Sequence, residues 1–164
     1  MTAILHEHQK IETEHLLADL LVAANRLTRV AASATGDSTS PAIWRTLSVL
    51  DNHGPMRLGE LATETRISQP TATKIVQNLN ELEWIKRIQD PHDARVRTLA
   101  VAPKGAQALK DWKQRLGHAL TPLFGDLSTA EWGHVKATVD LIRQRVRMSE
   151  QGETTIGDRS ERGE

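Results

Sequence analysis

The sequence predicts a mainly α-helical protein that carries one small β-hairpin. Apolar residues recur every three or four positions over most of the 164 residues, which is the spacing of amphipathic helices. The exceptions are two short runs at 85–89 and 96–101, rich in β-branched or long side chains and separated by the turn-forming sequence DPHDAR. A chain of this length is expected to form one domain of usual size, with or without an accessory element.

The first two helices are indicated by their apolar stripes and by the break between them. We expect the first helix over about residues 10–33, with the stripe Leu16, Leu20, Ala24, Leu27 and Ala31. It should end within ATGDSTS (34–40), where Ser40 can cap a second helix that has Pro41 at its first position. The apolar face of this second helix consists of Ile43, Trp44, Leu47 and Leu50.

A helix-turn-helix is predicted next. LGELATET (58–65) and SQPTATKIVQNLNEL (68–82) are both helical in pattern, and only Arg66 and Ile67 separate them. Two helices joined so closely cannot lie antiparallel and must cross steeply. The outward positions left on the second helix are Gln69, Pro70, Thr71, Thr73, Lys74, Gln77 and Asn78.

The hairpin that follows makes this a winged helix-turn-helix, flanked by helices suited to dimerisation. A further helix follows Pro103 and Gly105, and Ser128 with Glu131 forms a capping box for a last helix. Aromatics are only 3% of the chain, and a thin core of this kind often gains burial by pairing with a second subunit. The last helix carries a seam of apolar residues spaced by three and four: Trp132, Val135, Val139, Ile142 and Val146.

The expected organisation has four parts. Residues 1–36 are an N-terminal dimerisation helix, 37–104 the winged helix-turn-helix, and 105–149 the C-terminal dimerisation helices. Residues 150–164 have almost no apolar content and are expected to be a disordered tail.

Composition excludes several classes of function. Lys plus Arg and Asp plus Glu both number 21, so any basic surface must be local. The absence of cysteine excludes disulfides, thiolate catalysis and Cys-ligated zinc. No apolar run is long enough for a signal peptide or a membrane span, which predicts a cytoplasmic protein without a membrane partner.

Enzymatic and metal-sensing roles are not supported. The sequence has no nucleophile–base pair, glycine-rich phosphate loop or paired carboxylates at catalytic spacing. Seven histidines raise the alternative of zinc sensing, but none form a His-x-x-x-His pair on one helix face, and His6 and His8 lie in a terminus expected to fray. We therefore expect no catalytic residue, no metal and no cofactor.

The exposed face of the helix at 68–82 has the chemistry of a DNA reader. Gln, Asn and Thr donate and accept hydrogen bonds in the major groove, and Lys serves guanine or phosphate. The positive helix N-terminus can also approach a phosphate. Arg95 near the hairpin turn and Arg97 on the strand can reach a narrow minor groove or its phosphates.

Residues 57–105 resemble the MarR family of bacterial transcription regulators. The resemblance rests on LGELATET, RI, SQPTATKIVQNLNEL and the hairpin sequence DPHDAR with APKG after it. It implies a homodimer, held by the N- and C-terminal helices, that binds a pseudo-palindrome in double-stranded DNA. Ser68 to Asn78 would lie in the major groove, with Arg95 as the wing arginine.

Three positions depart from the family pattern. Trp84 stands where the family usually has the glycine that ends the recognition helix, which puts the left-handed cap and the angle of the wing in question. Ala94 replaces a common arginine and so removes a phosphate contact or a brace. Arg57 occupies a place where a Ser or Thr cap is common, which predicts a less regular start of the first helix of the pair.

The resemblance also implies regulation by a small molecule, often an aromatic or lipophilic acid, that releases the dimer from DNA. Repression is the family's usual mode. Arg29, Trp44 and Trp112 are candidates for lining such an effector site, although tryptophans at helical spacing more often belong to the core. The alternative is a dimeric protein-interaction module that keeps the winged fold without reading DNA sequence.

Overall fold

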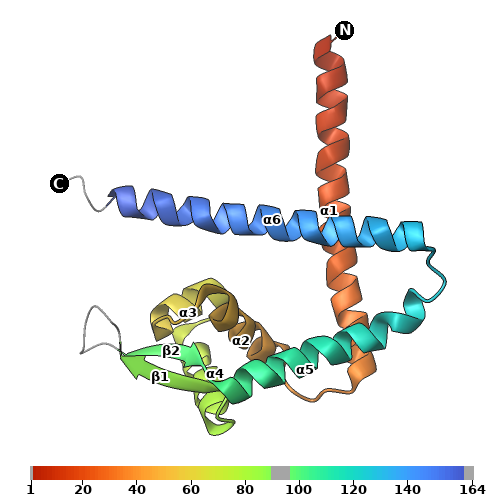
Figure 1. Ribbon diagram of the computed structural model, residues 1–164. Helices are drawn as coiled ribbons and strands as arrows, with labels where there is room; N and C mark the ends of the chain where they lie inside the picture. Colours follow the sequence, from red (N-terminus) through yellow and green to blue (C-terminus); the bar gives the residue numbers. More distant parts are fainter. Residues whose placement is uncertain (1, 90–96, 161–164) are drawn as a thin grey trace. The chain divides into compact units, whose positions relative to one another are not determined.

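The computed structural model describes residues 2–89 and 97–160, with side chains described over 11–89 and 97–149 (Figure 1). It confirms a mainly helical chain with one antiparallel hairpin. The chain forms two compact units, Met1–Leu120 and Thr121–Glu164. The elements in order are α1 (Thr2–Thr35), α2 (Pro41–His53), α3 (Leu58–Thr65), α4 (Gln69–Glu81), β1 (Ile85–Gln89), β2 (Arg97–Val101), α5 (Pro103–Leu120), a 3₁₀ helix (Thr121–Leu123) and α6 (Thr129–Ser160).

The boundaries of α2 follow the predicted capping chemistry. The Ala42 N–H donates to Ser40 Oγ at 3.3 Å, and Pro41 occupies the first position, where no N–H is needed. At the other end, Gly54 adopts φ 81° and its N–H donates to Leu50 O at 3.1 Å. Glycine tolerates this positive φ without steric cost, so the helix can end sharply here.

The helix-turn-helix is formed by α3 and α4, as predicted. Arg66 ends α3 in the left-handed region (φ 54°, ψ 45°), and the Ile67 N–H donates back to Ala62 O at 3.0 Å. A non-glycine residue in this conformation costs on the order of 1 kcal/mol, which the surrounding packing must offset. The chain thereby changes direction within Arg66 and Ile67, and Ser68 already caps α4.

The expected irregular start of α3 at Arg57 is wrong. The Leu61 N–H donates to Arg57 O at 2.9 Å, which is a regular first turn. The Arg57 N–H donates to the Glu60 carboxylate at 2.7 Å, so Glu60 supplies the reaching-back half of a capping box without a Ser or Thr at the cap.

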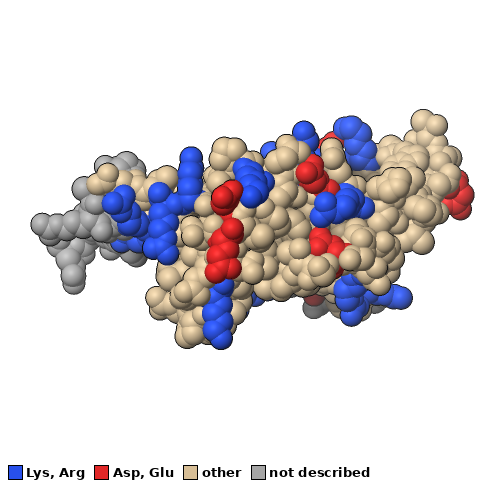
Figure 2. Space-filling view, turned by 90° about the horizontal axis from the view of Figure 1, so that it is seen from below, with Lys and Arg blue, Asp and Glu red and all other residues tan. Residues whose placement is uncertain are grey.

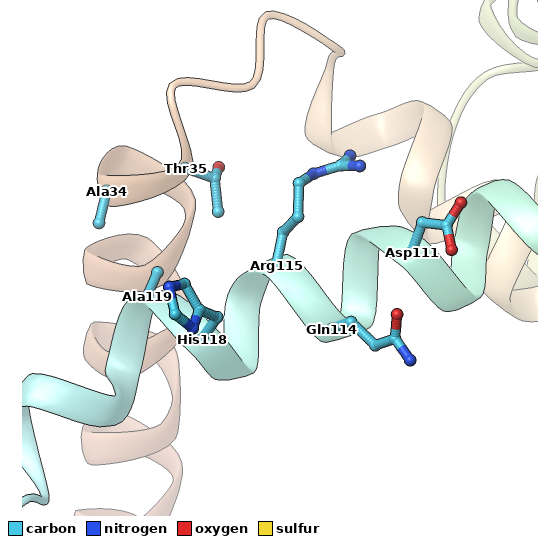
Figure 3. A pocket seen from close by; sticks show the side chains of 7 residues that line it. All are labelled: Ala34, Thr35, Asp111, Gln114, Arg115, His118 and Ala119. Carbon is cyan, nitrogen blue, oxygen red and sulfur yellow. The ribbon is translucent and has the colours of Figure 1, made fainter.

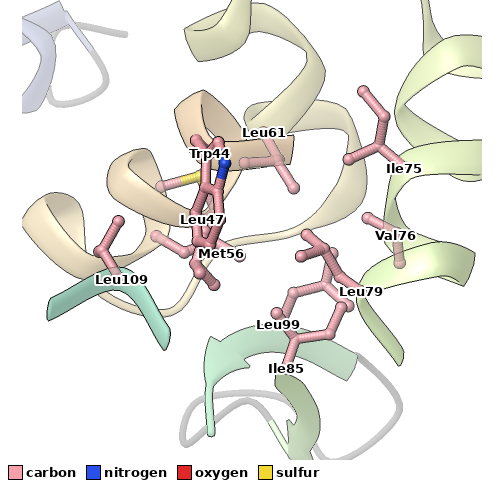
Figure 4. Close-up of a cluster of buried hydrophobic side chains, with 11 residues drawn as sticks. Trp44, Leu47, Met56, Leu61, Ile75, Val76, Leu79, Ile85, Leu99 and Leu109 are labelled. Atoms are coloured by element: carbon pink, nitrogen blue, oxygen red, sulfur yellow. The ribbon is translucent and has the colours of Figure 1, made fainter. Parts of the chain in front are cut away.

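The core of the first unit lies where α2, α3, α4, α5 and the hairpin meet. Figure 4 shows labelled apolar side chains from all of these elements pointing toward one another. The largest fully buried apolar side chains are Leu47, Leu50, Leu61, Leu79 and Leu109. Burying a leucine stabilises the fold by about 1.5–3 kcal/mol. This cluster therefore fixes α4 against α2, α3, α5 and the hairpin, and we call α3, α4 and the hairpin the reading head.

The hairpin pairs Ile85 with Val101 and Gln89 with Arg97 in antiparallel register. Met56, between α2 and α3, adds a short bridge: its N–H and C=O bond Leu99 at 3.1 and 2.8 Å. No local pattern in the sequence indicates this bridge, which ties the hairpin to the start of α3. The predicted second strand begins at Val96, but residues 90–96 lie outside the described part of the chain.

The long helices differ from expectation at their ends. α1 begins at Thr2 rather than near residue 10, and α6 continues to Ser160 although disorder is expected from residue 150. Extending an existing helix adds a hydrogen bond per residue without a new nucleation cost, so helices can run beyond their apolar stripes. No helix among the described residues is long and apolar enough to cross a membrane.

The start of α6 in the second unit confirms the predicted capping box. The Ser128 N–H donates to the Glu131 carboxylate at 2.8 Å, and the Glu131 N–H donates to Ser128 Oγ at 3.3 Å. The Ser128 hydroxyl and N–H both lower the pKa of Glu131. The five seam residues predicted on this helix are all exposed in the single chain, at 38–50% of their surface.

Candidate nucleic-acid interface

The second helix of the pair, α4, separates its residues cleanly into two faces. Its buried face consists of Ala72, Ile75, Val76 and Leu79, which pack into the core. The residues predicted to face outward are all exposed: Ser68, Gln69, Pro70, Thr71, Thr73, Lys74, Gln77 and Asn78. The helix therefore presents one continuous polar face.

The first turn of α4 already uses part of its hydrogen-bonding capacity. Ser68 Oγ accepts the Thr71 N–H at 3.3 Å and lies 2.8 Å from Thr71 Oγ1. The Thr73 hydroxyl donates to Gln69 O at 3.0 Å. Since Pro70 has no N–H, this turn offers a phosphate fewer donors than helix N-termini usually do.

The longer polar side chains of α4 are not engaged in this way. Within the described residues, no hydrogen bond or ion pair is formed by the side chains of Gln69, Lys74, Gln77 and Asn78. These side chains supply three amide groups and one ammonium group. A surface of this kind can donate and accept at once, which is the requirement for distinguishing base pairs in the major groove.

The end of α4 keeps a left-handed cap, although Trp84 replaces the glycine of the family pattern. The capping residue is Glu83, with φ 61°, one position earlier than the substitution. The Glu83 N–H donates to Asn80 O and the Trp84 N–H to Leu79 O, both at 2.9 Å. These two bonds are those of a Schellman motif, so Trp84 follows the cap and does not abolish it.

Trp84 also joins the hairpin to α5. Its carbonyl oxygen accepts the Ala102 N–H at 2.9 Å. Gly105, in the first turn of α5, packs so closely on this peptide that a Cβ added to it would lie 2.0 Å from Trp84 O. The end of α4, the start of β1 and the start of α5 are therefore held at one point.

The described part of the hairpin is basic on its exposed surface. Lys86, Arg87 and Arg97 are all exposed. The register places Arg97 opposite Gln89 and Arg87 opposite Leu99, so both arginines lie on the same face of the sheet. Figure 2 shows Lys and Arg side chains close together at the hairpin end of the molecule, on the left as in Figure 1. Arg95 and Ala94 lie outside the described residues.

A cavity of about 490 Å³ lies among α1, α2 and α5. The three residues predicted for an effector site, Arg29, Trp44 and Trp112, all line it. Trp44 is at the same time a core residue, only 4% exposed, and stacks on Trp84 and on Trp112. The core role expected for a tryptophan at helical spacing and a place in the cavity wall therefore coexist.

A second cavity, of about 610 Å³, lies between the end of α1 and the other side of α5 (Figure 3). Arg115 lines it and forms an ion pair with Asp37 at 3.2 Å, while Asp37 lines the first cavity. Burial by itself raises the pKa of Asp37, but hydrogen bonds from Thr39 and the charge of Arg115 outweigh it, so the pKa lies below its ordinary value. The charged form of Asp37 thus stabilises the connection between α1 and α2.

Replacing Asp37 with asparagine is expected to destabilise the protein by about 1 kcal/mol at pH 7. Because the folded-state pKa is lowered, the contribution is complete above the ordinary value of 3.8 and is lost as pH falls below it. The deficit measured by urea denaturation should therefore shrink toward pH 3. Asp51→Asn is the control, since its 3.6 Å pair with Lys113 is exposed and is worth at most about 0.5 kcal/mol. A deficit independent of pH would contradict the assignment.

The part of the chain that the structure describes contains no cluster of side chains suited to a metal ion. Over those residues, no three His, Asp or Glu side chains come close enough to hold an ion.

The closely joined helices α3 and α4, the exposed polar face of α4 and the basic hairpin define a winged helix-turn-helix protein. Residues 40–96 match the model of the MarR family. Over this segment the chain is similar to the MarR family, and its winged helix-turn-helix is that of a DNA-binding transcription regulator.

Related proteins agree with this assignment. The chain is 27% identical over 128 residues to the uncharacterized HTH-type transcriptional regulator Mb0904 of Mycobacterium bovis, an alignment that covers 77% of this chain and 90% of that protein. A MarR family protein from Bacillus stearothermophilus shares the fold, with a TM-score of 0.62, 21% identity and coverage of 86% and 97%. So does MepR from S. aureus, solved with ethidium bromide, with a TM-score of 0.54, 17% identity and coverage of 77% and 93%.

Proposed function

We propose that the protein is a homodimeric, sequence-specific repressor that a small molecule releases from a pseudo-palindromic operator. The observation that carries the proposal is the exposed face of α4, where Gln69, Lys74, Gln77 and Asn78 have no side-chain partner among the described residues. The core holds α4 through four buried residues, so the helix backbone that carries these polar side chains is held in place.

In this proposal, Ser68 to Asn78 enter the major groove of each half-site. The amides of Gln69, Gln77 and Asn78 read base edges, with the adenine edge as the usual bidentate partner of such side chains. Ser68, Thr71 and Thr73 mainly shape the first turn, since their hydroxyls already bond within the helix. Lys74 contacts guanine or phosphate.

The hairpin acts as the wing and supplies phosphate contacts. Arg97 and Arg87 share one sheet face, and both are exposed. Arg95 is assigned the minor-groove contact on the resemblance alone. Each cation that neutralises a phosphate releases a counterion, so these contacts provide affinity that depends on salt and not on sequence.

The dimer is assigned to the helices outside residues 37–104. The apolar seam of α6 has no cover in the single chain, and α1 also exposes large apolar side chains, among them Leu16 and Leu21 at 69% and 66%. Exposed stripes of this extent are typical of surfaces that pair. Two heads related by a dyad would read half-sites about one helical turn apart. A cytoplasmic location follows from this role.

The effector site is assigned to the cavity lined by Arg29, Trp44 and Trp112. Its guanidinium group and indole rings suit an aromatic or lipophilic acid. MepR, which shares the fold, was solved with an aromatic cation bound, which supports ligand binding in this fold. A ligand that prefers dimers with wrongly spaced heads would lower the affinity for DNA by its differential affinity for the two states.

Alanine substitutions should separate the two kinds of DNA contact. Lys74→Ala and Arg97→Ala are expected to weaken binding to all sequences and to reduce the salt slope by about one each. Gln69→Ala and Asn78→Ala are expected to relax base preference at one position each, by about 1–3 kcal/mol of discrimination. Fluorescence anisotropy on matched and mismatched duplexes over a range of salt measures both quantities. An unchanged affinity and slope in Arg97→Ala would remove β2 from the interface.

A further inference from the structure

Three of the four tryptophans in the chain form one continuous stack. The ring centroids of Trp84 and Trp44 are 5.0 Å apart, and the ring planes are inclined by 28°. The ring centroids of Trp44 and Trp112 are also 5.0 Å apart, with the planes inclined by 10°. Each ring comes from a different segment: Trp84 follows α4, Trp44 lies on α2 and Trp112 on α5. The stack therefore crosses the first unit from the reading head to the flanking helix.

One end of the stack is part of the reading head. The Trp84 N–H completes the cap of α4 on Leu79 O, and the next residue, Ile85, begins β1. Trp84 O accepts the Ala102 N–H. A displacement of the Trp84 peptide must therefore move the end of the recognition helix and the base of the hairpin together.

The other end of the stack forms a wall of the first cavity. Trp44 and Trp112 line that cavity, whereas Trp84 does not. Trp44 is buried among core residues and cannot shift without its neighbours shifting, because protein interiors are packed as densely as organic crystals. A change in the cavity wall is thereby passed to Trp84 through ring-to-ring contact.

We propose that the Trp84–Trp44–Trp112 stack couples the cavity to the DNA-reading head, with Trp84 as the positioning residue that sets α4 and the hairpin. The role of the cavity as an effector site rests on the proposed function, but the coupling between its wall and the head does not require a ligand. The left-handed residue of the cap is Glu83, so Trp84 directly follows the cap and its ring joins the stack.

A double-mutant cycle without any effector tests the coupling. Trp84→Leu, Trp112→Leu and the double variant are compared for affinity to the duplex that the wild-type protein selects from random DNA. Trp112→Leu is expected to weaken binding about fivefold in the wild-type background and less than twofold when Trp84 is already leucine. Fold-changes that simply multiply would overturn the proposal. Gln114→Ala, on α5 but outside the stack, is the control. Its fold-change in DNA affinity should be the same in the wild-type and Trp84→Leu backgrounds.

Conservative variants separate coupling from loss of folding. Trp84→Phe keeps an aromatic ring. In this background, Trp112→Leu is expected to weaken DNA binding by most of the fivefold seen in the wild type. If position 84 needed only an apolar side chain of similar bulk, the Trp84→Leu background would show the same fivefold loss. Circular dichroism establishes that each variant is folded at the assay temperature.

A spectroscopic readout covers the case in which Trp84→Leu does not fold. In a Trp84→Phe, Trp132→Phe protein, Trp44 and Trp112 are the remaining tryptophans, and neither lies on α4 or the hairpin. Because coupling is reciprocal, binding of the duplex is expected to change the fluorescence emission of these two tryptophans. The change should have the same midpoint duplex concentration as the binding curve measured by anisotropy. Unchanged emission at saturation would overturn the link. Failure of the wild type to bind any duplex would instead overturn the proposed function.

Discussion

Replacing Gly105 with alanine is expected to destabilise the first unit by about 3 kcal/mol or more, at the upper end of what an added methyl group costs in a packed site. The new Cβ would lie 2.0 Å from Trp84 O and 2.8 Å from the carbonyl carbon, and both atoms are backbone. Alanine favours a helix over glycine by at most about 1 kcal/mol, so the steric term decides the sign. Urea denaturation measures the loss.

Gly117→Ala is the matched control on the same helix. A Cβ at this position meets nothing within 4 Å, so the substitution should stabilise α5 by about 0.5–1 kcal/mol. Both glycines lie on α5, and the added Cβ meets backbone atoms at Gly105 alone of the two. If Gly105→Ala were as stable as the wild type, the close approach of α5 to the Trp84 peptide would be wrong, and with it the point that joins α4, β1 and α5.

Val139→Asp is expected to abolish the dimer and to lower operator affinity by about 100-fold or more. The residue is central in the α6 seam and 39% exposed in the single chain, so a carboxylate there leaves the isolated helix intact. Between two subunits the same charge would be buried without a partner, at a cost of several kcal/mol. Sedimentation velocity measures the association state, and anisotropy measures binding to DNA.

Gln144→Asp introduces the same charge on the opposite face of α6 by helical periodicity. It should leave both the dimer and the affinity close to those of the wild type. A Val139→Asp protein that remains dimeric and binds the operator would show that the seam is misplaced and that other apolar residues of α1 or α6 hold the subunits together.

The elements with local chemical signals could be predicted from the sequence. Ser40 with Pro41, and Ser128 with Glu131, cap the helices they were expected to cap. Capping depends on residues within one turn of each other, and the two-residue link between α3 and α4 permits few geometries. The outward face of α4 could be predicted from the spacing of its apolar residues by three and four positions.

Contacts between distant segments could not be predicted in this way. Nothing in the spacing of Trp44, Trp84 and Trp112 indicates that their rings stack. The bridge between Met56 and Leu99 likewise depends on how α2 and the hairpin pack. The cap at Glu83 was missed because a glutamate rarely adopts a positive φ, and the bonds to Asn80 and Leu79 hold it there.

For the candidate site, sequence patterns predicted which residues lie there better than which of their polar groups already form hydrogen bonds within the protein. Arg29, Trp44 and Trp112 were chosen from three separate helices and line one cavity. The hydroxyls of Ser68, Thr71 and Thr73, in contrast, were treated as readers but bond within α4. Internal bonding of short side chains competes with external contacts, and coordinates are needed to resolve that competition.

The proposed function depends above all on the exposed face of α4, which is expected to read DNA sequence in a symmetric dimer. Selection of binding sites from random duplex DNA by the purified protein, at a stated near-physiological salt concentration, tests it most directly. We expect an enriched palindrome with half-sites about one helical turn apart. Salt-sensitive binding without a motif, from a folded dimer, would contradict it and favour a winged module that has lost sequence reading.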